Sequence, residues 1–148
     1  MCSFLTHGDN SEAPMSGTGK NVNEEAGARK AVERLRIVAD FTYDWEYWRG
    51  TDKRFIYVSP ACERITGYSA DQFMEDPELF LRIIDAQDRS TIAAHIVSAD
   101  ENREPTFLQF RIRSRDGRER WIDHICQAVF SSEGEYLGRR ASNRDITD

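Results

Sequence analysis

Cysteine, long apolar runs and positive charge are all scarce in this chain of 148 residues. The three cysteines, Cys2, Cys62 and Cys126, are widely spaced, which excludes a Cys-x-x-Cys metal site or redox pair. No apolar run approaches the roughly 20 residues of a membrane span. The first residues also lack the basic start and long apolar segment of a signal peptide. We therefore expect a cytoplasmic protein that makes no membrane contact through this segment.

The balance of charges excludes another class of partner. The chain has 20 Lys and Arg against 26 Asp and Glu, a formal charge of −6. Binding to a nucleic-acid backbone requires a clustered excess of Lys and Arg, so we expect no nucleic-acid partner. Hydrophobic residues make up 39% of the chain and charged residues 31%. This composition indicates one globular domain with a packed core and a well-solvated surface.

The N-terminal part changes character near residue 23. Residues 1–22 are rich in small and polar residues and predict a flexible leader, in which Gly17-Thr18-Gly19-Lys20 is too short for a phosphate-binding loop. Residues 23–40 predict an amphipathic helix with Asn23 as its N-cap. Its apolar stripe consists of Ala28, Val32, Leu35 and Ala39. The stripe either packs on the protein's own domain or forms the seam of a homodimer, since its spacing suits helix pairing.

Residues 41–148 predict a folded domain that begins with a β-hairpin. Aromatic residues alternate with acids over residues 43–47, Gly50 begins a turn, and residues 55–58 are apolar. Four helix-start signals follow, at Ser59-Pro60, at the capping box Ser69–Gln72, at Asp76-Pro77, and at Asp88, which we expect to cap residues 89–99. Gly67 is expected to end the first of these helices.

The last third predicts three strands separated by turns at Asp116-Gly117 and Glu133-Gly134. In a strand, alternate side chains share a face. The expected inward faces are Leu108, Phe110 and Ile112 in one strand, and Ile122, His124, Cys126, Ala128 and Phe130 in the next. The order of elements predicts an α+β fold, with an antiparallel sheet covered on one face by short helices.

Five short segments add a more specific signal. They are Tyr43-Asp44-Trp45-Glu46, Tyr57-Val58-Ser59-Pro60-Ala61, Ile65-Thr66-Gly67-Tyr68-Ser69, Arg115-Asp116-Gly117 with Arg120-Trp121-Ile122, and Asp145-Ile146-Thr147. In this order and at this spacing they resemble the PAS domain family of bacterial signalling proteins, over roughly residues 33–148. The resemblance implies a PAS fold, with a five-stranded antiparallel sheet, short helices on one face and an N-terminal amphipathic helix.

The resemblance also implies a sensory function. Such a domain senses a small molecule in a pocket and passes the signal, through contacts between two copies of the chain, to a downstream effector such as a kinase or a cyclic-dinucleotide enzyme. Asp145 and Thr147 match the family positions that join the last strand to the output. The pocket candidates are Trp45, Tyr57, Phe110, Ile112, His124, Cys126 and Arg140. The alternative is a ligand-free protein-interaction module, in which Trp45, Tyr57, Phe110 and Ile112 fill the cavity.

We expect no metal, haem or flavin, and no enzymatic activity in this segment. Relatives that form a flavin photoadduct require Asn-Cys-Arg on a mid-domain helix, whereas Cys62 lies one helix too early and is expected to be a small buried hydrophobe. Relatives that bind haem place a histidine on the long helix. Here the apolar residues between Ile92 and Val97 place His95 at the solvent edge of that helix. No nucleophile and base, or pair of carboxylates, stands at a catalytic spacing.

Two polar positions on the predicted strands require partners. His124 on an inward face needs a hydrogen bond, either to a neighbouring protein group or to a ligand. Arg139 and Arg140 are adjacent, so one of them points inward. By the family's pattern we expect Arg140 to point inward and to need an acidic partner or an anionic ligand. The alternative is a salt bridge from Arg140 to Asp44 or Glu46.

Overall fold

A computed structural model of the chain describes residues 18–148. The chain divides into two units, residues 1–34 and residues 35–148, and each is described by itself. Helix α1 (Thr18–Asp40) forms the described part of the first unit and ends in the second. It begins before the expected N-cap, so Asn23 lies inside the helix and caps nothing, and residues 18–22 of the expected leader are helical. The rest of that leader lies outside the described residues.

The C-terminal part of α1 carries apolar side chains in solvent. Leu35 and Val38 are each 70% exposed, and Phe41, which follows the helix, is 83% exposed. Ala39 is half-buried. Leu35 therefore does not pack on its own domain, and the homodimer seam stays a prediction.

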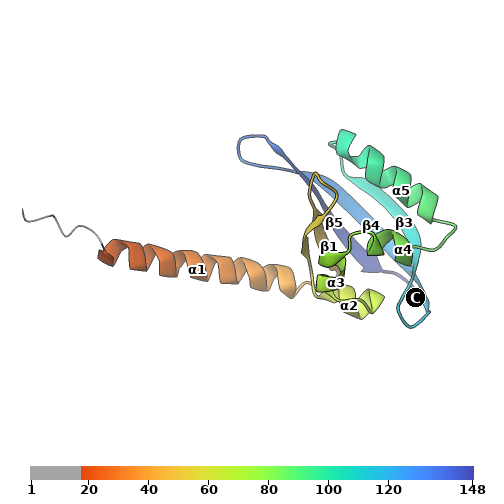
Figure 1. Ribbon diagram of the computed structural model, residues 1–148, viewed down its shortest axis with the longest axis horizontal. Helices are drawn as coiled ribbons and strands as arrows, with labels where there is room; N and C mark the ends of the chain where they lie inside the picture. The colour runs from red at the N-terminus through yellow and green to blue at the C-terminus, as the bar shows by residue number, and fades with distance from the viewer. Residues whose placement is uncertain (1–17) are drawn as a thin grey trace, which may run out of the picture. The chain divides into compact units, whose positions relative to one another are not determined.

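The second unit contains the remaining elements in the predicted order (Figure 1). They are β1 (Trp45–Arg49), β2 (Phe55–Val58), α2 (Ala61–Thr66), α3 (Ala70–Glu75), α4 (Leu79–Ile83), α5 (Arg89–Ser98), the 3-10 helix η1 (Ala99–Glu101), β3 (Thr106–Arg113), β4 (Glu119–Phe130) and β5 (Tyr136–Asp145). The predicted hairpin, four short helices and three strands are confirmed.

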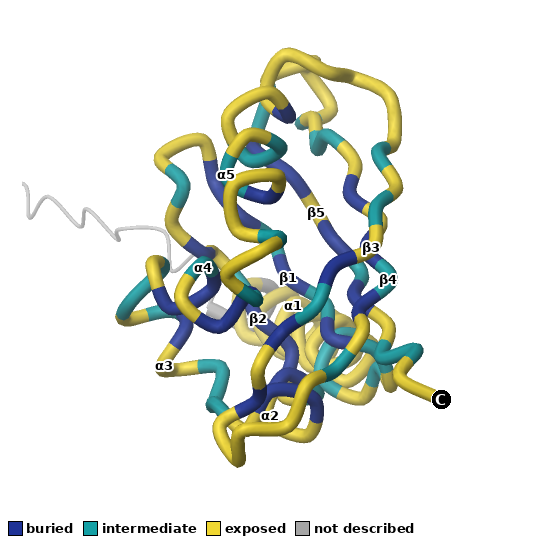
Figure 2. Tube along the Cα trace, turned by 90° about the vertical axis from the view of Figure 1, so that its right-hand side faces the viewer, coloured by how far each residue is buried: buried dark blue, intermediate teal, exposed yellow. Residues whose placement is uncertain are grey.

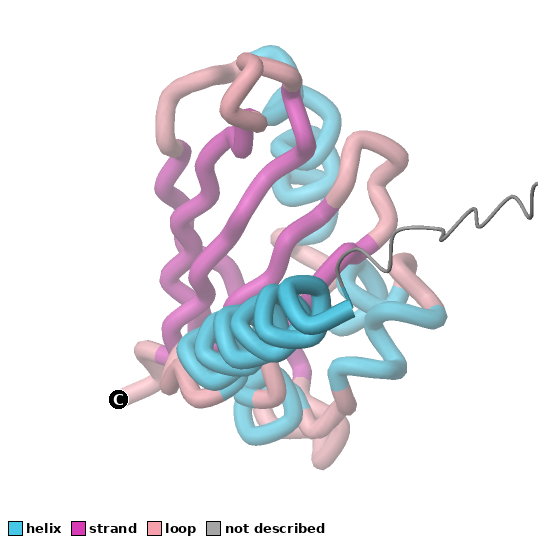
Figure 3. Tube along the Cα trace, turned by 90° about the vertical axis from the view of Figure 1, so that its left-hand side faces the viewer, coloured by secondary structure: helices cyan, strands magenta, loops and turns pink. Residues whose placement is uncertain are grey.

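The strands form one antiparallel sheet in the order β2-β1-β5-β4-β3 (Figure 3). The last strand, β5, lies at the centre and pairs with β1 on one side and β4 on the other. Because β5 is the last strand and pairs with β1, the first strand, it brings together residues that are far apart in the sequence.

The core lies between one face of the sheet and the short helices. Buried positions follow the strands and α2 to α4, whereas α5 is mostly exposed (Figure 2). Aromatic side chains fill much of this space: the ring of Trp45 lies 5.3 Å from that of Phe73 and 5.8 Å from that of Phe80, which lies 6.2 Å from Phe110. Burial of such large rings is the main stabilising contribution of this layer.

Two of the local signals for the helix ends are confirmed. Gly67 ends α2 with a φ of 82°, and Ser69 and Gln72 form both hydrogen bonds of the capping box at α3. Two expected caps are wrong, because their side chains bind the sheet instead. The Ser59 hydroxyl accepts a hydrogen bond from the Glu46 amide at 2.8 Å. The Asp88 carboxylate accepts hydrogen bonds from the amide and the guanidinium of Arg111 at 2.9 Å.

None of the described helices combines the length and the apolar character needed to cross a bilayer.

Candidate functional site

A polar cluster lies between α5 and the sheet, where β1, β4 and β5 run side by side. It surrounds a cavity of about 30 Å³, roughly the volume that one water molecule occupies in the liquid. The lining residues are Tyr47, Arg49, Gly50, Lys53, His95, Ile96, Ala99, Asp100, Cys126 and Arg139. We call this space the inner cavity.

His124 and Asn143 form the deepest part of the polar cluster. His124 is 2% exposed and Asn143 is fully buried. The distance between His124 Nδ1 and Asn143 Oδ1 is 2.7 Å, and Asn143 Nδ2 donates to the Trp45 carbonyl at 3.1 Å. Burial lowers the pKa of His124 to about 4, although the hydrogen bond to Asn143 opposes this shift. His124 is therefore neutral near pH 7, and its partner is a protein group, as the first of the two alternatives predicted.

His95 is not at the solvent edge of α5, and that prediction is wrong. Its Nε2 lies 3.3 Å from the sulfur of Cys126, and its ring contacts His124 edge to face at a centroid distance of 5.4 Å. Val97 is 74% exposed, so the buried side of α5 is rotated away from Val97 and towards His95. Burial lowers the pKa of His95, and the positive charges of Arg139 and Arg49 lower it further.

Arg139, and not Arg140, points into the cluster, which corrects the expectation from the family's pattern. Arg139 is 7% exposed and donates to the carbonyls of Ala99 at 2.8 Å and Asn102 at 2.6 Å. Arg140 is exposed and forms an ion pair with Glu46 at 2.9 Å. The alternative salt bridge is therefore the correct interpretation of Arg140. The alternation of β5 that buries Ala141 and Asn143 also carries Arg139 inward.

The other pocket candidates have different positions. Trp45, Phe110 and Ile112 are at most 1% exposed and belong to the packed core. Tyr57 does not line the inner cavity, because its half-buried hydroxyl donates to Asp40 Oδ1 at 2.7 Å. The expected role of Cys62 as a buried hydrophobe is confirmed: it is fully buried, and burial raises its pKa to about 12.

Sequence reasoning missed Arg49, which is 8% exposed and lines the inner cavity. Its guanidinium carbon lies 4.6 Å from the centre of the Phe55 ring and 4.9 Å from that of Phe80. A signal for this position was present in the sequence. Trp45 and Tyr47 point inward, so the period of two places Arg49 on the same face.

His95, His124 and Cys126 could hold a metal ion by position alone. Their ligand atoms all lie within 4.8 Å of one another. However, Arg139 Nη2 lies 3.4 Å from the sulfur of Cys126, and Arg49 lines the same cavity. A divalent cation here would be close to two guanidinium groups, which repel it. The arrangement therefore fits an anion better than a cation.

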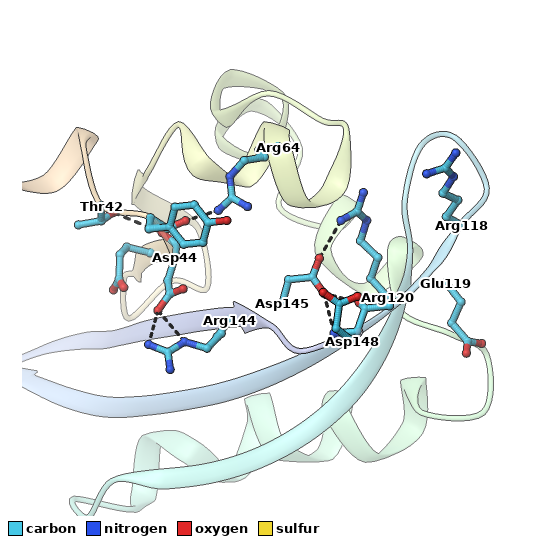
Figure 4. A pocket seen from close by; sticks show the side chains of 12 residues that line it. Thr42, Asp44, Arg64, Arg118, Glu119, Arg120, Arg144, Asp145 and Asp148 are labelled. Atoms are coloured by element: carbon cyan, nitrogen blue, oxygen red, sulfur yellow. Dashed lines mark hydrogen bonds and ion pairs between the residues drawn. The ribbon is translucent and has the colours of Figure 1, made fainter.

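A second candidate site is an open groove of about 880 Å³ at the end of β5 (Figure 4). We call it the exit groove. It is lined by Thr42, Tyr43, Asp44, Glu46, Arg64, Arg118, Glu119, Arg120, Arg144, Asp145, Thr147 and Asp148. Asp44, which precedes β1, accepts hydrogen bonds from Arg144 on β5 at 3.3 Å. The chain thus enters the sheet and leaves it at the same place.

Asp145 and Thr147 are held by hydrogen bonds at the end of β5. Asp145 Oδ2 accepts a hydrogen bond from Arg120 at 2.7 Å, and Asp145 Oδ1 accepts one from the Thr147 amide at 3.0 Å. The Thr147 hydroxyl accepts a hydrogen bond from the Trp121 amide at 3.2 Å. Burial alone would raise the pKa of Asp145, but hydrogen bonds from Thr147 and Arg120 hold it below its usual value. The end of β5 is thereby fixed to β4.

Comparison with known proteins identifies relatives of this structure. The sequence profile of a family described as PAS fold matches residues 55–139. The chain is 32% identical over 66 residues to the blue light receptor lreB of Aspergillus flavus, covering 45% of this chain and 13% of that protein. Overall, the chain spans only 13–16% of the length of the curated relatives it matches.

Two solved structures show the same fold. One is a PAS domain from Colwellia psychrerythraea, with a TM-score of 0.66 at 23% identity, covering 79% of this chain and 98% of that chain. The other belongs to a histidine kinase from Haloarcula marismortui, described as light and redox sensing. Its TM-score is 0.60 at 26% identity, covering 78% of this chain and 99% of that chain.

Proposed function

The chain belongs to the PAS fold family, and on that premise we propose that it is the sensory domain of a larger signalling protein. In this proposal a small molecule binds at the inner cavity, and β5 passes the change to the exit groove and on to an effector. We also propose that the domain itself performs no catalysis, and the burial of Cys126, which is only 4% exposed and whose thiol lies beside His95, supports this.

The observation that carries this proposal is the course of β5. Every second residue of β5 points inward, and this row of side chains runs from the inner cavity to the exit groove. Arg139 lines the cavity, Asn143 bonds His124, and Asp145 bonds Arg120. Arg139 and Asp145 belong to the same strand, so a displacement of the β5 backbone at Arg139 would reach Asp145 without passing through a flexible loop. Figure 4 shows Asp145 directed at Arg120 beside the final residues of the chain.

The relatives support a downstream effector in the same parent chain. The Haloarcula marismortui structure is a domain of a histidine kinase, and we propose a kinase or a cyclic-dinucleotide enzyme as the effector here. We further propose that the domain works as a homodimer in the cytoplasm. The exposed Leu35 and Val38 supply an apolar surface for the dimer, and the buried free thiols of Cys62 and Cys126 suit a reducing compartment.

A second candidate function is ligand-free protein interaction. The packing of Trp45, Phe110 and Ile112 favours it, because these side chains are fully buried in the hydrophobic core and leave no room there for a ligand. The buried polar cluster favours sensing instead, since an interaction module gains nothing from burying Arg49 without a hydrogen-bond partner at its Nε.

The substitution Asp145→Ala in the full parent protein tests the sensory proposal. We expect regulation of the effector to change or disappear, while the domain loses only about 1 kcal/mol of stability, because the Asp145–Arg120 pair is partly exposed. Asp123→Ala, which removes a carboxylate from β4, is the matched control and should leave regulation intact. Unchanged regulation in the Asp145→Ala protein would contradict transmission through β5.

A further inference from the structure

The inner cavity holds two arginines on one face of the sheet, directly across from each other. Arg49 on β1 and Arg139 on β5 are register partners in the antiparallel pair. Both are more than nine-tenths buried, and both line the cavity. Like charges in directly opposed positions of a sheet destabilise it, and a guanidinium remains charged at any physiological pH.

Neither guanidinium has an acidic partner among residues 18–148. The ion pairs of this part of the chain include neither Arg49 nor Arg139. Arg139 donates to backbone carbonyls through Nη1 and Nη2 but leaves its Nε without a partner, whereas Arg49 has only the faces of aromatic rings such as Phe55 and Phe80. Aromatic faces stabilise a cation but leave its N–H donors free.

The other groups around the cavity do not neutralise this charge. His124 is neutral and His95 has a lowered pKa. Asp100, a carboxylate that lines the cavity, interacts electrostatically with Arg139, but it is paired with Lys53 and accepts a hydrogen bond from Tyr136 at 2.6 Å. The wall of the cavity thus carries two guanidinium groups that have no ion-pair partner, and Asp100 offsets their charge only in part, a costly state unless an anion enters.

We propose that the inner cavity is a binding site for a small anion. The forked guanidinium of Arg49 would hold the anion, and the positive charge of Arg139, on the neighbouring strand, would add to the attraction. The cavity volume of about 30 Å³ admits one small group. The occupant is therefore an inorganic anion, or the carboxylate end of a metabolite whose remainder lies at the mouth. This inference rests on the proposed sensory function and names the chemical class that the domain senses.

Binding to the full 148-residue chain tests the proposal. Sodium acetate, phosphate, sulfate and chloride are titrated separately at constant ionic strength, by calorimetry and by the midpoint of thermal unfolding. We expect saturable one-to-one binding of at least one of these anions. Acetate in preference to the inorganic anions indicates a carboxylate, and the reverse order indicates an inorganic ion. Zinc chloride at matched chloride serves as the cation probe.

Arg49→Met is the decisive variant, because it removes the charge and keeps most of the apolar stem, while Arg139 continues to satisfy its carbonyls. It should bind the anion about ten- to a hundredfold more weakly. In buffer that lacks the four tested anions it should be at least as stable as the wild type, since the opposed charges are gone. Arg49→Lys, which keeps a charge but loses the fork, should bind with intermediate affinity. The exposed Arg54 provides the matched control, and Arg54→Met should bind as the wild type does.

Several results would overturn the proposal. These are the absence of binding by all four anions, undiminished binding by Arg49→Met, and an equal loss in Arg54→Met. One-to-one zinc binding without anion binding would also overturn it, and would assign His95, His124 and Cys126 to a metal. The anion-binding experiment and the test of the sensory proposal can fail separately. The first measures binding to the 148-residue chain, whereas the second measures regulation of the effector in the Asp145→Ala protein.

Discussion

Asn143 on β5 and His124 on β4 are joined by a 2.7 Å hydrogen bond between Oδ1 and Nδ1, and both side chains are buried. Asn143→Ala would leave His124 without its partner, remove a hydrogen bond to the Trp45 carbonyl and create a small cavity. We expect a loss of about 2–4 kcal/mol in the free energy of unfolding, measured in urea. The neighbouring exposed variant Arg144→Ala should change stability by about 0.5 kcal/mol or less. Equal losses in the two variants would contradict a structural role for this bond.

Stability should fall with acidification in a window set by His124. Its pKa is about 4 in the folded protein and about 6.5 when unfolded. The unfolded state therefore binds more protons between these values, and stability is lost as the pH falls from 6.5 towards 4. From pH 7 to pH 5, His124 alone should remove about 2 kcal/mol. The lowered pKa of His95 acts in the same direction.

The matching control for this pH dependence is His124→Gln, which keeps a hydrogen-bond partner for Asn143 but does not titrate. Its free energy of unfolding in urea should depend less on pH between 7 and 5 than that of the wild type. The aspartates with lowered pKa values, such as Asp88 and Asp145, add their contributions at lower pH. An identical pH dependence in both proteins would show that His124 is not buried in its neutral form.

Gly138 allows β5 to approach β1 closely. Its φ is 105°, and a Cβ at this position would overlap the carbonyl oxygen of Arg49 and lie 2.9 Å from the Gly50 Cα. Gly138→Ala should therefore cost more than about 2 kcal/mol of stability. Gly117→Ala has a similar positive φ of 84° but no atom within 4 Å of the added Cβ, so it should cost only about 1 kcal/mol. Urea unfolding of both variants separates backbone strain from steric overlap.

The exposed apolar residues of α1 predict a homodimer. Leu35→Glu introduces a charge where the seam is expected, so it should lower the apparent mass in sedimentation equilibrium. Arg36→Glu, at the adjacent exposed position, is the control and should leave the mass unchanged. A wild-type chain that is already monomeric at high micromolar concentration would contradict the dimer.

The purified domain should be colourless. Cys62 is buried with a raised pKa, which makes it a poor nucleophile for a flavin adduct. The inner cavity of about 30 Å³ is also far smaller than an ordinary cofactor pocket. An absorption spectrum of the chain purified from its own host tests this prediction, and a stoichiometric visible band from haem or flavin would contradict it.

The sequence by itself determined the order of the elements, the C-terminal end of α2, the start of α3, and most of the inward faces of β3 and β4. Phe130, expected on the inward face of β4, is 38% exposed. Each of the correct predictions depends on local chemistry: Gly67 adopts a positive φ, Ser69 and Gln72 cap reciprocally, and alternation in a strand buries His124 with Cys126. Such preferences act over a few consecutive residues, so they can be predicted without knowing which residues lie nearby in the folded protein.

Tertiary structure alone decided which polar groups meet. His95 lies against Cys126 and His124 on β4, a contact that the apolar pattern of α5 alone did not predict. The pairing of β1 with β5 placed Arg49 opposite Arg139, residues that are distant in the sequence. Contacts of this kind depend on the register of the strands and on the position and rotation of each helix against the sheet. Both are fixed only when the whole core packs together.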